Sequence, residues 1–175
     1  QLTTILAIIR VFETSRPLGS YAACVVLNDG AGISYGISQF THRSGSLAEV
    51  VREYLRRGGR VGREVLADAL PRLDTTTPHS IAVLSANDDL RSFFFTAAAT
   101  TEMREAQDAV AAQKYLGPAM RIWTEKGFEK ALSLAVIYDS ITHGSFEKIA
   151  SGIITRDERS WTLSYIKRRD KWLAS

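Results

Sequence analysis

Cysteine is nearly absent from this chain, with Cys24 alone among 175 residues. A lone cysteine excludes an intrachain disulfide and every zinc motif built on paired cysteines. Proline and glycine are scarce, at 4 and 12 residues, which excludes collagen-like and low-complexity chains. The longest apolar runs, 21–27 and 131–137, fall far short of the roughly 20 residues that a membrane-spanning helix needs. We therefore expect a soluble protein without a membrane span.

The rest of the composition is that of an ordinary globular chain. Hydrophobic residues make up 45% and charged residues 23% of the sequence, close to the averages for soluble domains. At roughly 100 to 200 residues per domain, the length predicts one domain over 1–175 that closes its own core. The net charge is +3 and the pI about 9.1. Such a surface suits a polyanion, whether nucleic acid, an anionic wall polymer or a membrane surface.

The hydrophobic pattern predicts a mostly helical α+β protein with one small hairpin. Apolar residues recur at helical spacing over 2–12, so an opening helix should end near 13–15, ahead of Pro17. Two short runs, 21–27 and 33–40, flank an Asn-Asp-Gly-Ala-Gly turn at 28–32, and Asp-Gly between such runs is a strong hairpin signal. Helical patterns follow at 47–55, 61–70 (up to Pro71), 87–95, 101–115, 118–124, 128–142, 146–153 and 157–173, with a polar loop at 74–78.

Glu13 and Asp29 are the candidate chemical pair. Hydrolysis of a glycosidic bond uses two carboxyl groups, a protonated one that gives its proton to the leaving oxygen and an ionised one that acts on water or on the sugar. Glu13 ends an apolar helix, where burial favours the protonated form, whereas Asp29 stands on a polar turn that favours the ionised form. The spacing alone favours the ordinary interpretation, a solvent-facing glutamate and a common Asn-Asp-Gly turn, over a catalytic pair.

Longer segments of the chain resemble a known family. Val11-Phe12-Glu13, the stretch 28–37, Phe40 and Gly45 look like the catalytic region of the family 46 chitosanases, members of the lysozyme-like superfamily. A second block resembles the same family: Ala106-Gln107, Tyr115, Pro118-Ala119, Gly127, Tyr138-Asp139-Ser140 and His143-Gly144. The resemblance implies a lysozyme-like α+β fold, with the hairpin beside a catalytic cleft, and glycoside hydrolase activity.

The resemblance also implies roles for individual residues. Glu13 becomes the general acid and Asp29 the general base of an inverting displacement, and Ser34 replaces a threonine that helps to hold the attacking water. Carboxyl groups about 6.5 to 9.5 Å apart would support inversion, and a separation of about 5 Å would support retention instead. Asp139 matches an aspartate of an ion network behind the active site, and Arg169 matches its arginine partner. This pair would orient the catalytic groups.

Two departures from the family pattern change the predicted substrate. Ala31 replaces an arginine of the family's Asp-Gly-Arg-Gly turn, and Ser46 stands near the aspartate that chitosanases use to recognise the glucosamine ammonium. A net positive chain without that acid disfavours chitosan, because chitosan is a polycation.

The segment 34–41 is similar instead to the Ser-Tyr-Gly-x-x-Gln-Phe turn of peptidoglycan-cleaving lysozyme-like enzymes. It places Tyr35, Gln39 and Thr41 among the substrate-binding residues, together with His143 at the edge of the cleft. We predict a muramidase-type hydrolase of the β-1,4 bonds of peptidoglycan, antimicrobial and acting outside the cell or at the cell wall, with chitosan as the alternative substrate. No metal or cofactor is implied.

Other functions remain open at this stage. A non-enzymatic wall-binding or assembly module would keep the cleft without turnover. Arg56, Arg57, Arg60 and Arg63 form a basic patch that could touch phosphates, although a solvated turn between helices is favoured and no nucleic-acid partner is predicted. The chain starts at Gln1, and we expect a processed or excised piece of a larger chain or assembly that lacks a substrate-wall segment found in the chitosanases.

Overall fold

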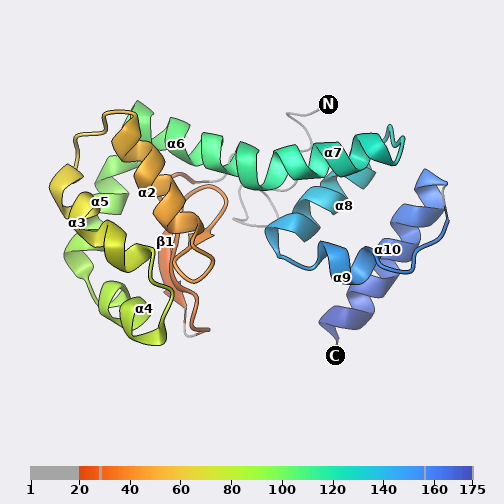
Figure 1. Ribbon diagram of the computed structural model, residues 1–175, viewed down its shortest axis with the longest axis horizontal. Helices are drawn as coiled ribbons and strands as arrows, with labels where there is room; N and C mark the ends of the chain where they lie inside the picture. The colour runs from red at the N-terminus through yellow and green to blue at the C-terminus, as the bar shows by residue number, and fades with distance from the viewer. Residues whose placement is uncertain (1–19, 28, 156, 175) are drawn as a thin grey trace. The chain divides into compact units, whose positions relative to one another are not determined.

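The computed structural model describes residues 20–27, 29–155 and 157–174 (Figure 1). The predicted opening helix and Glu13 lie outside these residues. The described residues divide into two compact units, 20–27 with 29–111 and 112–155 with 157–174. We call the first the sheet unit and the second the helical unit. The prediction of one domain over 1–175 stays a prediction.

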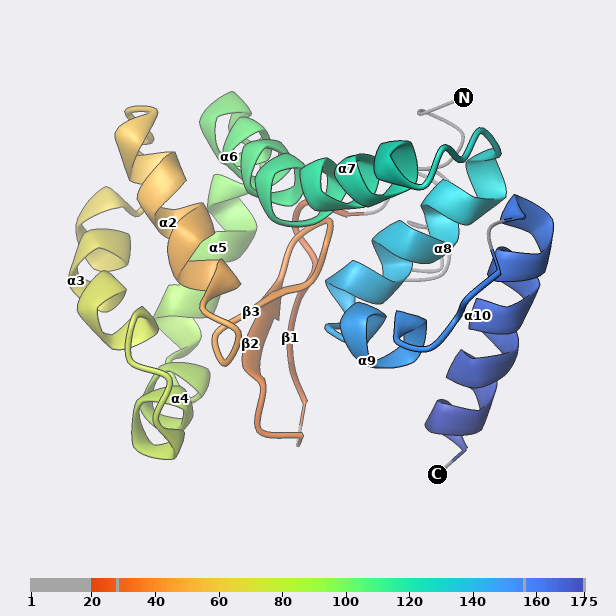
Figure 2. The same ribbon diagram turned by 45° about the vertical axis from the view of Figure 1, so that its right-hand side comes forward.

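The predicted hairpin is present in the sheet unit. Strands β1 (Cys24–Leu27), β2 (Gly32–Tyr35) and β3 (Phe40–Thr41) form an antiparallel sheet in the order β1-β2-β3 (Figure 2). Cys24 pairs with Tyr35 and Leu27 with Gly32, which leaves Asp29 in the connecting turn. Gly30 and Gly32 both have φ of +76°, a conformation that glycine adopts without strain. The run predicted over 33–40 is therefore two strands separated by a turn.

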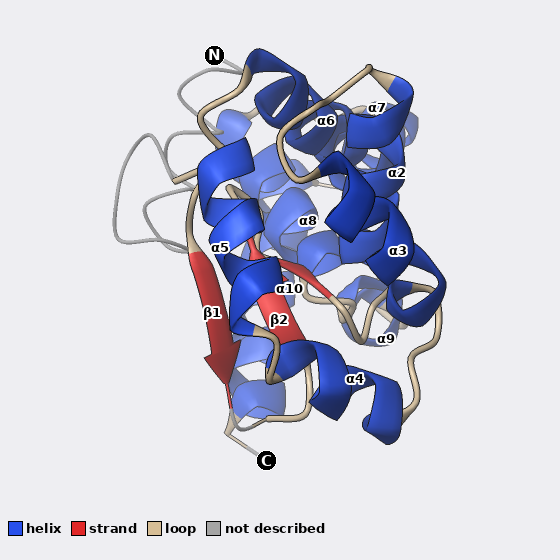
Figure 3. Ribbon diagram, turned by 90° about the vertical axis from the view of Figure 1, so that its left-hand side faces the viewer, coloured by secondary structure: helices blue, strands red, loops and turns tan. Residues whose placement is uncertain are grey.

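Helices surround this sheet within the same unit: α2 (Ser46–Arg56), α3 (Arg63–Leu73), α4 (Pro78–Ser85), α5 (Asp88–Ala97) and α6 (Thr101–Ala111). Helix α2 packs against α3, α6 and β3, while α4 packs against β2 and α5 against β1 (Figure 3). The buried core includes Tyr35, Val50, Tyr54, Leu66, Leu90 and Phe94. The helices thus hold the hairpin from several sides and fix the position of its turn.

Two helices in this unit differ from the prediction. Helix α4 was not predicted, although Thr77 caps it by accepting a hydrogen bond from the Ser80 N–H and Pro78 occupies its first turn, both ordinary start signals. Its eight residues are too few to give a clear period. Helix α3 continues through Pro71 to Leu73, because a proline bends or weakens a helix without always ending it.

The helical unit begins with a π-helical turn, Ala112–Leu116, directly after α6. It continues with α7 (Gly117–Glu125), α8 (Ala131–Thr142), α9 (Phe146–Ala150) and α10 (Glu158–Leu173). Its core is aromatic: Trp161 stacks on Tyr165 at 5.1 Å between ring centroids and contacts Phe128 at 5.3 Å. No helix among the described residues has the length and hydropathy of a membrane span.

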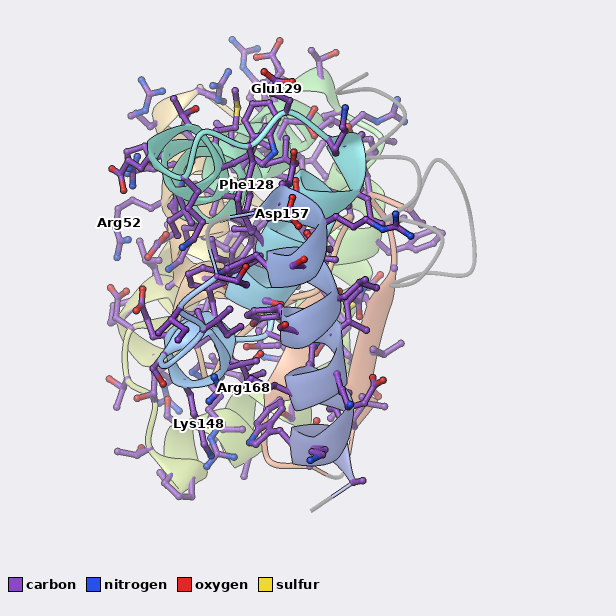
Figure 4. The ribbon with its side chains drawn as sticks, turned by 90° about the vertical axis from the view of Figure 1, so that its right-hand side faces the viewer. Arg52, Phe128, Glu129, Lys148, Asp157 and Arg168 are labelled. Carbon is purple, nitrogen blue, oxygen red and sulfur yellow. The ribbon has the colours of Figure 1, made fainter. Side chains whose placement is uncertain are left out.

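A carboxylate fixes the start of α8. The predicted helix began at residue 128, but Phe128 is buried in the core and α8 starts at Ala131. The Glu158 carboxylate accepts hydrogen bonds from the backbone N–H groups of Glu129 (3.1 Å) and Lys130 (2.7 Å). Figure 4 shows Phe128 and Glu129 beside the end of α10 that Asp157 caps. The carboxylate thus satisfies amides just ahead of α8.

Candidate active site

The candidate site centres on the turn that carries Asp29. The side chain is exposed, and its Oδ1 accepts a hydrogen bond from the Ala31 N–H at 2.9 Å. This local bond is an Asx turn, which fixes the rotamer of the carboxylate. No described group hydrogen-bonds to the other oxygen, so the fixed carboxylate can accept a proton from a water in front of the turn.

Arg43 braces the same turn from the loop after β3. Its backbone N–H donates to the Ala31 carbonyl at 3.0 Å, and its Nη1 donates to the Asp29 carbonyl at 3.4 Å. The preceding residue, His42, is fully buried, and its Nε2 lies 3.0 Å from the Arg72 carbonyl. The loop is therefore anchored to the end of α3 and holds a cation beside the Asp29 turn.

Ser34 lies on the central strand of the sheet, opposite Val25 on one side and Thr41 on the other. It is 5% exposed. The structure thus brings Asp29, Ser34 and Thr41 together on one small hairpin sheet, as their predicted roles require. The roles themselves stay predictions.

The structure corrects the predicted role of Tyr35 as a substrate contact. Tyr35 is 0% exposed, and its hydroxyl donates to the Phe94 carbonyl at 2.8 Å. Its ring packs on Phe94 with centroids 4.6 Å apart, and burial raises the pKa of its hydroxyl. Tyr35 fastens β2 to α5 and cannot reach a polymer.

Gln39 and Thr41 make local contacts that shape the end of the hairpin. Gln39 has a positive φ of 48°, and its Nε2 donates to the Gly36 carbonyl at 2.9 Å. The Thr41 hydroxyl donates to Ser44 Oγ at 2.8 Å. Both side chains are partly exposed, so contact with a substrate remains open to them.

Ser46 is fully buried at the start of α2. Its hydroxyl accepts the Thr41 N–H at 3.0 Å and lies 2.7 Å from Ser44 Oγ. This serine therefore joins β3 to α2. It offers no negative charge to a substrate ammonium.

Gln107 is a positioning residue to which sequence reasoning assigned no role. It is 0% exposed in α6, its Oε1 accepts the Ile37 N–H at 2.9 Å, and its Nε2 donates to the Tyr21 carbonyl at 3.0 Å. A Cβ on Gly36 would lie 2.1 Å from that Oε1, so glycine is required there. Two signals were in the sequence: Gln107 belongs to the block that resembles the family, and its amide lies on the apolar face of a helix, which marks a buried polar group in need of partners.

Asp139, Arg169 and His143 form a second group, within the helical unit. Arg169 Nη1 forms an ion pair with Asp139 Oδ2, and His143 Nδ1 lies 3.4 Å from the other carboxylate oxygen. Arg169 Nε is buried without a hydrogen-bond partner among the described residues. The predicted pair therefore meets, and its part in orienting catalytic groups stays a proposal.

Metal-ligating side chains do not gather in the part of the chain that the structure describes, where no cluster of three His, Cys, Asp or Glu residues is found. Cys24 is half-buried, and burial raises the pKa of its thiol. A raised thiol pKa lowers the thiolate fraction and hence the nucleophilicity.

A mostly helical chain with a small antiparallel sheet, whose turn presents an exposed aspartate, has the architecture of a lysozyme-like glycoside hydrolase. Residues 7–173 match glycosyl hydrolase family 46, and the chain belongs to that family. This membership confirms the predicted family, the predicted fold class and, at the level of the family, the predicted enzyme class.

Known relatives are chitosanases. A chitosanase of Bacillus subtilis (strain 168) is 32% identical over 135 residues, which are 77% of this chain and 48% of the relative. The chain thus spans about half the length of this curated relative. A mutant chitosanase of Bacillus subtilis MY002 complexed with 6 GlcN has a TM-score of 0.82 at 26% identity, over 97% of this chain and 76% of that chain. The complex of a Gynuella sunshinyii chitosanase with chitotetraose has a TM-score of 0.80 at 28% identity, with the same two coverages.

Proposed function

We propose that this chain belongs to a glycoside hydrolase that cleaves β-1,4 bonds in an amino-sugar polymer, with chitosan as the first substrate. The observation that carries the proposal is the family match over residues 7–173, with relatives that are chitosanases, one of them complexed with 6 GlcN. These relatives favour chitosan over the peptidoglycan that we predicted from the sequence.

The turn geometry supports Asp29 as the general base. An exposed carboxylate with one oxygen held by the Ala31 N–H presents the other to a water. Ser34 would help to align that water, and Glu13, which lies outside the described residues, would protonate the leaving oxygen. Inversion of the anomeric centre follows because Asp29 would activate a water on the face opposite the acid and would not itself attack the sugar.

The ion pair of Asp139 and Arg169 has a supporting part in this proposal. Removal of one partner from a partly buried pair leaves an uncompensated charge. The two side chains are 21% and 23% exposed, so the pair is largely shielded from water and joins α8 to α10 within the helical unit. We propose that it orients its surroundings without touching the reacting atoms.

Peptidoglycan remains the second candidate because of two observations at the sheet unit. Ser46 is buried and carries no charge, and the cation next to the Asp29 turn is Arg43. A site for a polycation favours acidic side chains, whereas peptidoglycan carries carboxylates. Both polymers lie outside the cytoplasm, so either substrate implies delivery to a cell wall or the exterior.

The test is a reducing-end assay on chitosan and, separately, on purified peptidoglycan. Asp29→Asn and Glu13→Gln should each lower kcat by about 10² to 10⁴, the range for loss of a general acid or base. Asp68→Asn, an exposed aspartate of α3, is the matched control and should keep full activity.

The outcomes separate the candidates. Release of reducing ends from chitosan alone supports chitosan as the substrate. Release from peptidoglycan alone would show that peptidoglycan, and not chitosan, is the substrate. Folded protein that binds a polymer but releases no ends from either would support a non-enzymatic binding module instead.

A further inference from the structure

A cavity of about 500 Å³ lies beside the Asp29 turn, entirely within the sheet unit. Gly30 and Gly32 of the turn line one side, and Ile81 and Ser85 of α4 line the other. Arg43 also lines it. Helix α4 packs against β2 next to this turn (Figure 3). The volume falls in the usual range for small-molecule sites, about 300 to 1,000 Å³.

Glycine at position 32 makes the close approach of α4 possible. A Cβ on Gly32 would lie 2.9 Å from Ile81 Cγ2 and 3.2 Å from His42 Cβ, closer than atoms in normal contact. The cavity wall is thus set by a backbone position that cannot carry a side chain. Val26 and Leu27, 39% and 56% exposed on β1, add an apolar side to the cavity.

The polar groups of the cavity favour an anion. Among the described residues, Arg43 is the only charged one that lines the cavity. Its guanidinium makes no ion pair with any of them, and its side-chain hydrogen bond is to the Asp29 carbonyl. Arginine presents a planar fork of donors that matches a carboxylate.

A second polar group in the cavity wall is unsatisfied. The Ser85 hydroxyl is buried and has no hydrogen-bond partner among the described residues. Buried hydroxyls are normally paired, so a ligand or an ordered water is expected at this oxygen. Within the described part of the chain, the cavity thus combines an arginine without an ion-pair partner, an unsatisfied hydroxyl and apolar walls.

We propose that this cavity binds a sugar unit that carries a short carboxylate substituent, with Arg43 holding the carboxylate and the apolar walls holding the adjoining carbon atoms. The inference rests on the proposed function only in taking this sugar as a unit of the glycan that reaches the Asp29 turn. The inference extends the substrate class from polymers of amino sugars to glycans in which a carboxylated sugar is joined to the amino sugar.

The test is an NMR titration of the whole chain with N-acetylmuramic acid and with N-acetylglucosamine, which lacks the lactyl carboxylate. The Gly32 amide and the Ile81 methyl groups report on the cavity. We expect the acidic sugar to bind about tenfold more tightly, the scale of a charge-assisted hydrogen bond. Arg43→Gln should abolish the difference, and Arg43→Lys should retain part of it. Arg60→Gln, an exposed arginine outside the cavity, should leave it unchanged.

Each result decides the inference. Equal affinities for the two sugars, or an unchanged preference in folded Arg43→Gln, would overturn it. Shifts confined to residues outside the cavity would overturn it as well. The proposed function fails separately, if chitosan and peptidoglycan both stay intact, and the binding preference would survive that failure.

Discussion

Replacing Gln107 by alanine removes a side chain that ties α6 to the turn between β2 and β3. Two hydrogen bonds are lost, from the Ile37 N–H and to the Tyr21 carbonyl, each worth about 1 kcal/mol net. Ile37 is 2% exposed, so its N–H is left buried without a partner, at a further cost of about 1 to 2 kcal/mol. We expect the free energy of unfolding to fall by about 3 to 4 kcal/mol.

The assay is urea unfolding followed by circular dichroism, with Gln113→Ala as the control. Gln113 is exposed, and its replacement should change the free energy of unfolding by less than about 0.5 kcal/mol. A loss below about 1 kcal/mol for Gln107→Ala would refute the reasoning, since it would mean that water or a rearranged turn satisfies Ile37 at little cost.

Three further predictions follow from the described contacts. Hydrogen bonds and charge from Arg56 and Arg57 lower the pKa of Glu53 to about 2 from 4.5. The stability that this provides is about 1 kcal/mol, because the Arg56 side chain is solvent-exposed; it is present above pH 4.5 and lost toward pH 2. Unfolding of Glu53→Gln across that range should lack this part of the pH dependence. Glu158→Ala should lower the melting temperature, with a loss of about 1 kcal/mol as for a missing helix cap, and calorimetry that shows no change would contradict the contact described. Proton NMR of fresh products should show the α anomer first, because we propose inversion by Asp29, and a β anomer would point to retention.

The sequence predicted the parts of the fold that depend on local signals. The Asp29-Gly30 turn between two short β-forming runs predicts the hairpin, and the structure has it with the expected residues in the turn. The helical patterns at 47–55 and 157–173 correspond to α2 and α10. These elements are fixed by neighbours in sequence, which is why their type was predictable.

Tertiary contacts decided the features that the sequence did not predict. The sequence indicates Tyr35 as an exposed aromatic beside a catalytic turn, yet its hydroxyl donates a hydrogen bond to the backbone carbonyl of Phe94, 59 positions away. The spacing of Phe128 predicted a helical position, but its ring packs against Trp161 in the core, ahead of the start of α8. The cavity beside Gly32 depends on α4, whose packing on β2 has no local signature.

The residues of the candidate site could be predicted from the sequence, but the substrate that they bind could be predicted only in part. Asp29 and Ser34 could be chosen from the resemblance, and the ion pair of Asp139 and Arg169 is present where it was sought. The substrate depends on charges brought together by folding. The burial of Ser46 and the position of Arg43 over the turn became visible only with the fold.

Mass spectrometry of the products from chitosan tests the central claim most directly. Wild-type protein should release glucosamine oligomers of defined length, and folded Asp29→Asn should release none above the background of buffer alone, with peptidoglycan digested in parallel. An intact polymer with the wild type, or the same oligomers from Asp29→Asn as from the wild type, would contradict the account of a hydrolase that uses Asp29 as its base.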